Sequence, residues 1–145
     1  MGSLAKLIAL PAAERRLLLA AAGLLAAVRV GLWTFPFRSV YGAVRSRGPS
    51  ARGAGVPGEP SSERIVWAVE VAARRVPRAT CLVRALAAQA LLARYGHASE
   101  LRLGVARGAG RAFEAHAWLE GNGQILIGGA TQERYVPLPS LDSRP

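Results

Sequence analysis

The chain has few side chains that could carry catalysis or hold a metal. Its 145 residues include one cysteine, Cys81, and two histidines, His97 and His116. A single cysteine excludes intramolecular disulfides, and these counts also exclude cysteine-rich zinc sites and histidine-rich metal clusters. We therefore expect no bound metal and no cofactor, and any nucleophilic chemistry must use very few residues.

Acidic residues are also scarce, with 9 Asp and Glu against 19 Lys and Arg and a formal net charge of +10. A surface this basic attracts anionic partners such as nucleic acid, an acidic peptide or an anionic membrane. All the basic residues except Lys6 are arginines, scattered as singles and pairs without the aromatic ladder of a single-strand binder. We expect no nucleic-acid partner, and the net charge by itself does not identify any partner.

An uncharged apolar stretch, Leu17 to Val28, is too short to cross a bilayer, which needs about 20 residues. Arg15 and Arg16 precede it, as in a secretory or twin-arginine signal, but the chain stays apolar through Trp33. The pattern favours a helix over about residues 12–33. This helix could pack on the rest of the protein or lie in a membrane interface with its arginines at the headgroups.

Composition predicts three segments. Residues 46–62 are rich in glycine, proline and serine and are expected to form a flexible linker. The linker separates an N-terminal helical segment, residues 1–45, from a folded domain over residues 63–140.

Two helices and an antiparallel meander are predicted after the linker. The helices run from Glu63 to about Val76, with Ser62 as N-cap, and from Thr80 or Cys81 to Tyr95. From Glu100 onward the apolar period changes to two. This predicts strands from residue 100, over 112–120 and over 124–127, with a hairpin turn at residues 121–123. The fold class is therefore α+β, with helices packed on a small antiparallel sheet.

Cys81 and His116 form the one credible nucleophile and base. A cysteine at the start of a helix lies near unpaired backbone N–H groups, which favour its thiolate. His116 follows in a strand, and a cysteine facing a histidine is the arrangement of nucleophilic catalysis. The competing interpretation of Cys81 is a buried structural cysteine, and His97 is expected to be an exposed loop histidine.

Four blocks of sequence resemble the standalone leader peptidase of lasso-peptide biosynthesis, a family with a transglutaminase-like, papain-related cysteine protease fold. The blocks are ATCLVRAL (79–86), LGV (103–105), FEAHAWLE (113–120) and ERYVPL (133–138). The resemblance implies a cytoplasmic cysteine endopeptidase that removes the leader from a ribosomally made precursor and frees the core N-terminus for cyclisation. It also implies three partners: the precursor peptide, a small leader-recognition protein and an asparagine-synthetase-like cyclase. The first helix is in addition a candidate for contact with a membrane surface.

On this resemblance Cys81 attacks the scissile carbonyl, and His116 takes the thiol proton and later protonates the leaving amine. The Cys81 backbone N–H would contribute to an oxyanion hole. Members of the family commonly carry an aspartate at the place that Gly128 occupies here, and counting back across the hairpin puts Gly128 or Gly129 opposite His116. Glu133 is the first candidate for the orienting acid. The alternative is a Cys–His dyad whose imidazole is held by a backbone carbonyl or a side-chain amide.

Two other functions compete with the peptidase. The missing carboxylate at Gly128 favours a non-catalytic module of a peptide-maturation complex, which would hold an extended peptide by strand addition. The same Cys–His arrangement could also transfer an acyl group to an amine instead of to water.

Overall fold

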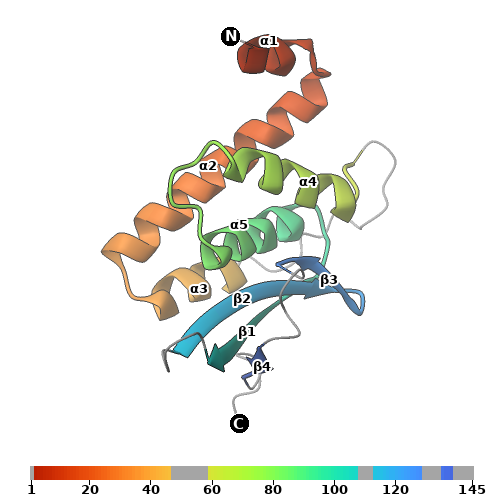
Figure 1. Cartoon of the computed structure of the whole chain (residues 1–145). Helices are drawn as coiled ribbons and strands as arrows, with labels where there is room; N and C mark the ends of the chain where they lie inside the picture. The colour runs from red at the N-terminus through yellow and green to blue at the C-terminus, as the bar shows by residue number, and fades with distance from the viewer. Residues whose placement is uncertain (1, 47–58, 108–112, 129–134, 139–145) are drawn as a thin grey trace.

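A helical layer packs on one face of a small sheet (Figure 1). The computed structural model describes residues 2–46, 59–107, 113–128 and 135–138. The helices are α1 (Gly2–Ala9), α2 (Ala12–Thr34), α3 (Phe37–Ser46), α4 (Ser62–Ala73) and α5 (Cys81–Arg94). The strands are β1 (Glu100–Arg107), β2 (Phe113–Gly121), β3 (Gln124–Ile127) and β4 (Val136–Pro137). The expected α+β class is confirmed.

The sheet has the strand order β3-β2-β1-β4, and its pairings are antiparallel. β1 and β2 pair along their whole length, whereas β3 pairs only with residues 119–121 of β2. Asn122 and Gly123 have φ angles of 52° and 74°, as a two-residue type I′ hairpin turn requires. The predicted meander is confirmed, and β4 is an addition that the sequence pattern did not indicate.

The hydrophobic core lies between α2, α4, α5 and the sheet. α2 buries a stripe of residues at helical spacing against α4 and α5: Leu17, Leu18, Ala21, Leu25 and Val28. From the sheet side, Leu101, Ala117, Leu119 and Ile127 complete the same cluster. The N-terminal helix therefore packs on the rest of the protein, one of the two placements left open by its sequence.

α2 has 23 residues and is longer than its uncharged stretch, since it continues through Arg29 to Thr34. Within the described residues it is the one helix long and apolar enough to cross a membrane. Core helices of soluble proteins and signal sequences meet the same criterion.

The helix boundaries differ from the predicted ones at α4. Its N-cap is Ser61 rather than Ser62, because the Ser61 hydroxyl accepts a hydrogen bond from the Arg64 N–H at 3.2 Å. α4 also ends at Ala73, earlier than Val76, as the Ala72 carbonyl accepts the N–H groups of two following residues in a tightened last turn.

α5 begins and ends close to where the sequence predicts. It starts at Cys81 with Thr80 as N-cap, and Gly96, with φ of 82°, follows its C-cap, Tyr95. Most of the predicted linker, residues 47–58, lies outside the described residues, so the proposed division into segments stays a prediction.

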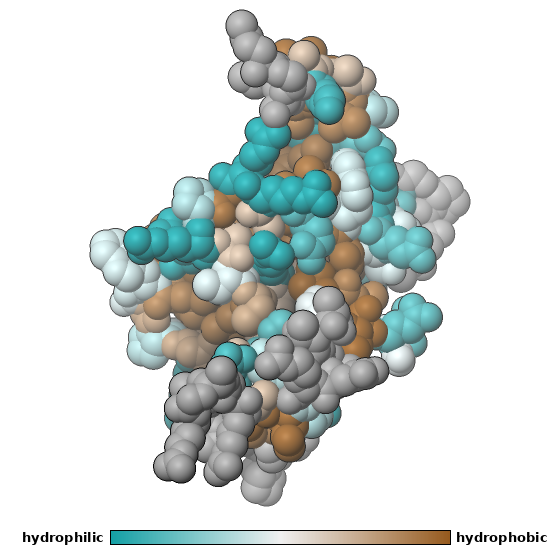
Figure 2. All heavy atoms as spheres, in the orientation of Figure 1, coloured by the Kyte–Doolittle hydropathy of each residue, from teal (hydrophilic) through white to brown (hydrophobic). Residues whose placement is uncertain are grey.

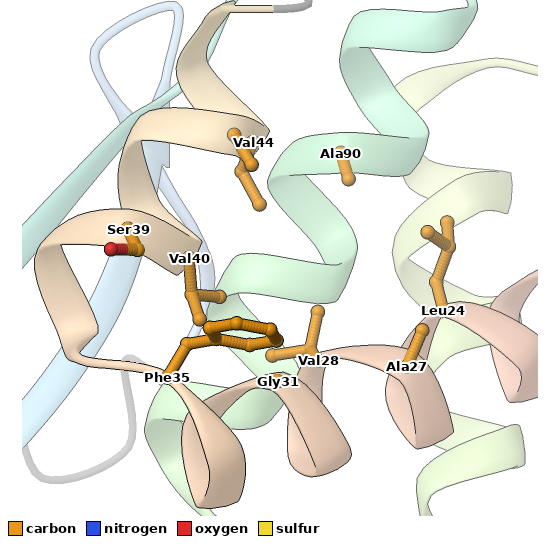
Figure 3. Close-up of a pocket in the computed structure, with 10 residues that line it drawn as sticks. Leu24, Ala27, Val28, Gly31, Phe35, Ser39, Val40, Val44 and Ala90 are labelled. Atoms are coloured by element: carbon orange, nitrogen blue, oxygen red, sulfur yellow. The ribbon is translucent and has the colours of Figure 1, made fainter.

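α3 turns back beside α2 and α5 and leaves an apolar hollow of about 380 Å³ between the three helices (Figure 3). Ten residues line it: Leu24, Ala27, Val28, Gly31, Phe35, Ser39, Val40, Ala43, Val44 and Ala90. Hydrophobic residues also gather on the molecular surface around α3 and over the upper part of α2 in the view of Figure 2. This hollow is therefore formed by the helical layer and not by the sheet.

Candidate active site

Cys81 is the first residue of α5 and is partly exposed as a free thiol. Its side chain packs against the hydrophobic core. The Thr80 hydroxyl accepts the Val83 N–H at 3.4 Å, which caps one of the N–H groups of the first turn. The N–H groups of Cys81 and Leu82 have no acceptor within the helix, so the helix start provides donors beside the sulfur.

Arg84 fastens the segment that leads into α5. Its Nε donates to the Ala79 carbonyl at 3.0 Å, and its guanidinium forms an ion pair of 3.4 Å with Glu70 of α4. One side chain therefore joins the end of the α4–α5 connection to both helices, and this connection determines where Cys81 lies.

His116 is held by a backbone carbonyl. Its Nε2 lies 2.7 Å from the carbonyl oxygen of Gly128, which follows β3. A carbonyl oxygen only accepts hydrogen bonds, so Nε2 carries the proton and, in the neutral ring, Nδ1 keeps a free lone pair. This is the tautomer in which Nδ1 can act as a base.

The sheet face that carries His116 is not the face packed against the helices. Side chains alternate along β2, so Ala117 and Leu119 enter the core while His116, Trp118 and Glu120 lie on the other face. The Tyr135 ring stacks on the His116 ring with centroids 4.9 Å apart, and the Trp118 ring lies 6.1 Å away. The imidazole is therefore flanked by two aromatic rings.

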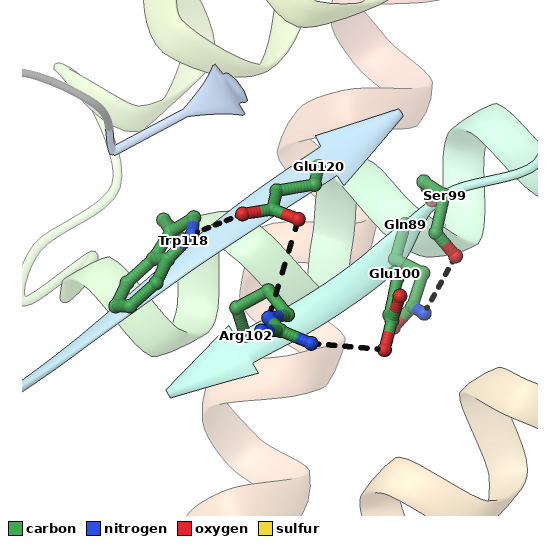
Figure 4. Close-up of polar contacts among 6 residues, drawn as sticks. All are labelled: Gln89, Ser99, Glu100, Arg102, Trp118 and Glu120. Carbon is green, nitrogen blue, oxygen red and sulfur yellow. Dashed lines mark hydrogen bonds and ion pairs between the residues drawn. The ribbon is translucent and has the colours of Figure 1, made fainter. Parts of the chain in front are cut away.

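Trp118 is fully buried on this face and anchors a polar network. Its Nε1 donates to Glu120 at 2.9 Å, and Arg102 of β1 pairs with Glu120 and Glu100 (Figure 4). Gly104 of β1 lies against the Trp118 ring, where an added Cβ would come within 2.7 Å of the ring. The absence of a side chain at Gly104 is thus what lets the indole lie flat beside the imidazole.

The sequence pattern of the transglutaminase-like superfamily matches residues 22–140, most of the chain. The chain belongs to the transglutaminase-like superfamily. Cysteine proteases are among the members of this superfamily. No curated protein matches the chain. No solved structure matches it either.

In this transglutaminase-like chain, α5 packs on β2, and both elements begin at the same end of the molecule (Figure 1). Among the described residues no hydrogen bond joins the Cys81 thiol to His116. His116 lies on the sheet face turned away from the helices, whereas Cys81 packs against the core on the other face, so the described structure does not bring the thiol and the imidazole together. The roles of Cys81 and His116 therefore stay predictions.

Gly128, at the place where the family commonly carries an aspartate, lies beside His116. Its position opposite the imidazole agrees with the hairpin count, and its contact is the backbone carbonyl that the dyad alternative required. Glu133 lies outside the described residues. Glu120, on the same face, binds the Trp118 indole instead of the imidazole.

His97 differs from its expected position, and Tyr135 is a neighbour of His116 that the sequence did not indicate. His97 is not an exposed loop residue but is partly buried, and its Nε2 donates to the Pro60 carbonyl at 3.1 Å, which ties the α5–β1 loop to the start of α4. Tyr135, which stacks on His116, was not singled out from the sequence. It adjoins a two-residue strand, too short to show any periodicity.

The described residues contain no group of three or more His, Cys, Asp or Glu side chains arranged to hold a metal ion. The arrangement around His116 has one histidine, two aromatic rings and a backbone carbonyl, which suits proton transfer.

Proposed function

We propose that this protein is a cysteine endopeptidase that removes the leader from a lasso-peptide precursor. The observation that carries the proposal is the bond from His116 to the Gly128 carbonyl, since it presents Nδ1 as a base in a chain of the transglutaminase-like superfamily. The choice of a lasso-peptide precursor rests on the resemblance of the Cys81 and His116 blocks to that peptidase family.

The proposed reaction requires the imidazole and the start of α5 to come together when the precursor binds. His116 Nδ1 then takes the Cys81 thiol proton, and the thiolate adds to the scissile carbonyl. The oxyanion is bound by the Cys81 backbone N–H at the start of α5. The imidazolium then protonates the leaving amine, which is the new N-terminus of the core peptide. Water, deprotonated by the same imidazole, hydrolyses the thioester and releases the leader.

The proposed setting is the cytoplasm, where a small leader-recognition protein delivers the precursor and an asparagine-synthetase-like cyclase closes the freed core. The resemblance to the leader peptidase supports these partners.

The decisive test is cleavage of a cognate precursor, in the presence of its recognition protein, followed by mass spectrometry. We expect one cut, no turnover for Cys81→Ala, and a rate about 10²–10⁴-fold lower for His116→Ala, the usual contribution of a general base. His97→Ala is the matched control, because His97 binds only the Pro60 carbonyl in the structure, and it should cleave at the parent rate. Cleavage by Cys81→Ala at the parent rate would overturn the proposal.

A non-catalytic peptide-binding module is the second candidate. It is favoured by the absence, among the described residues, of a hydrogen bond between Cys81 and His116 and of a carboxylate on the imidazole. Such a module binds precursor without turnover, and iodoacetamide at neutral pH modifies its thiol no faster than it modifies free cysteine. Rapid alkylation of Cys81 that slows in His116→Ala would exclude it. Acyl transfer would be recognised by a peptide–amine product when an amine is added.

A further inference from the structure

α2 carries a second apolar stripe, on the side opposite the core. Its residues are spaced alternately four and three apart and form what we call the outer face of α2: Leu19, Gly23, Ala26, Val30 and Trp33. The large side chains are well exposed, Leu19 at 63%, Val30 at 56% and Trp33 at 86%. Isolated exposed apolar residues are ordinary, but a continuous stripe along a helix marks an interaction surface.

Two further exposed apolar side chains lie just beyond the ends of α2. Phe35, directly after α2, is 63% exposed, and Ile8 of α1 is 67% exposed. Phe35 also lines the apolar hollow between α2, α3 and α5 (Figure 3), and Leu19 lines a second apolar hollow of about 400 Å³ between α1, α2 and α4. Apolar surface therefore accompanies α2 over its whole length.

The charged residues of the segment that carries this surface are almost all basic. Six basic residues occur in the first 46 residues: Lys6, Arg15, Arg16, Arg29, Arg38 and Arg45. The one acidic residue in this segment, Glu14, is ion-paired with Arg64 of α4. Arg15 and Arg16 come directly before the outer face, and Arg29 lies within its length. An apolar stripe bordered by cations complements an anionic lipid surface.

The opposite stripe of α2 decides between lying on a membrane and crossing it. Ala21 and Leu25 are completely buried against the rest of the core. A crossing helix would have to leave α4 and α5 and expose their buried residues to water. The packed arrangement instead leaves one face available, which suits a helix lying in the plane of the interface. Trp33 and Phe35 then lie at the depth where aromatic side chains concentrate.

We propose that this protein binds the surface of an anionic lipid bilayer through the outer face of α2, without crossing the bilayer. The apolar side chains enter the boundary between headgroups and acyl chains, and the neighbouring arginines contact lipid phosphates. This inference does not depend on the proposed peptidase activity.

The test is flotation of the full-length protein with phosphatidylcholine vesicles that contain or lack phosphatidylglycerol. We expect binding to the anionic vesicles, weaker binding to the neutral ones, and a decrease with added salt, since the lipid charge is screened. Bromine-labelled lipids should quench the tryptophan emission, and Trp33→Leu should lower that quenching, because Trp33 is 86% exposed on the outer face whereas Trp118 is buried and Trp67 of α4 is partly buried against the core.

Two valines provide a matched pair of variants. Val30 on the outer face and Val136 on β4 are both exposed, so each should accept glutamate without loss of the fold. We expect Val30→Glu to lower vesicle binding by at least about tenfold, since it puts a charge into the apolar face, and Val136→Glu to leave binding unchanged. Leu19→Glu is a second variant on the same face, and thermal unfolding confirms that each variant is folded.

Three results would overturn the proposal. The first is no binding to anionic vesicles at low ionic strength. The second is equal binding by the Val30→Glu, Leu19→Glu and parent proteins, which would mean that charge alone attracts the protein. The third is a dimer in light scattering, without lipid, that Val30→Glu dissociates, because the outer face would then be covered by a second copy of the chain.

Discussion

At the scale of single residues, the imidazole of His116 is held by a main-chain oxygen and flanked by the rings of Tyr135 and Trp118. A carboxylate in this place would give the imidazolium a full opposite charge, whereas a carbonyl gives only a dipole. The carbonyl still fixes the tautomer, which is the requirement for a base at Nδ1. Glycine suits the position since its φ is 85° and an added Cβ would come within 2.9 Å of the Ala117 carbonyl.

We predict that the neutral imidazole of His116 is the Nε2–H tautomer. Nitrogen-15 NMR of the labelled protein at alkaline pH distinguishes the two ring nitrogens by chemical shift. His97→Ala simplifies the spectrum to one histidine. An Nδ1–H tautomer for His116 would contradict the hydrogen bond to Gly128.

Gly104 allows a second residue-scale prediction. Gly104→Ala would put a methyl group within 2.7 Å of the Trp118 ring and 2.9 Å of the Tyr135 Cβ. We expect a loss of about 1–3 kcal/mol in the free energy of unfolding, as for other overpacked positions. Gly42→Ala in α3 is the control, because no atom lies within 4 Å of its added Cβ, and should be stabilising by up to about 1 kcal/mol. Urea denaturation measures both, and equal effects would show that Gly104 is not confined by the indole.

At the scale of elements, the start of α5 depends on contacts that the short connection from α4 makes. Arg84 joins that connection to Glu70, but its ion pair is more than one third exposed and contributes little to stability by itself. Its main consequence is therefore positional, because Cys81 begins the helix that Arg84 fastens.

We predict that Arg84→Met lowers the cleavage rate several-fold while costing no more than about 1 kcal/mol of stability. Arg94→Met, at the exposed end of the same helix, is the matched control and should leave the rate unchanged. Rates from single-turnover cleavage and urea denaturation separate the two effects. If the cleavage rate of both variants fell in proportion to their loss of free energy of unfolding, Arg84 would have no separate role in positioning Cys81.

The sequence predicted the elements whose pattern is local. The start of α5 at Cys81, strand 124–127 and the hairpin at residues 121–123 are confirmed, since a cap, a period of two and an Asn-Gly turn are all readable from neighbouring residues. The predicted N-cap of α4, Ser62, was one residue too far along the chain. The observed N-cap is Ser61, and two adjacent serines give the same capping signal. β4 was not found, since a two-residue strand ending in proline has no periodicity and is tolerated only at a sheet edge.

The candidate site was predictable as far as residue type carries the information. Cys81 and His116 could be singled out because each is scarce and lies at a telling position. A backbone carbonyl is present in every residue, so no pattern of letters could assign the contact to Gly128 rather than to a side chain. The hydrogen bond between His97 and the Pro60 carbonyl joins residues 37 positions apart, and local periodicity does not reveal such a contact.

At the scale of the whole molecule, α2 forms part of the core that α4, α5 and the sheet share. The exposed fraction of both Leu25 and Ala21 of α2 is 0%, so this helix is part of the folding unit. The described segments on both sides of the predicted linker therefore should unfold together.

We predict that Leu25→Ala costs about 2–5 kcal/mol, as for other buried leucines, and lowers the stability of the whole protein in one cooperative transition. Leu19→Ala on the same helix is the control and should change stability by no more than about 0.5 kcal/mol, because Leu19 is 63% exposed. Circular dichroism and tryptophan fluorescence during urea denaturation should give one midpoint for each variant. Separate midpoints would show that α2 unfolds independently of the sheet.

The bond between His116 and Gly128 also affects how the site can change during evolution. A triad with an aspartate can be lost by one codon change at that aspartate, but a main-chain acceptor has no codon of its own. Substitutions remove it only by altering the path of the backbone after β3. The hydrogen bond should therefore respond mainly to insertions, deletions or the loss of glycine at position 128.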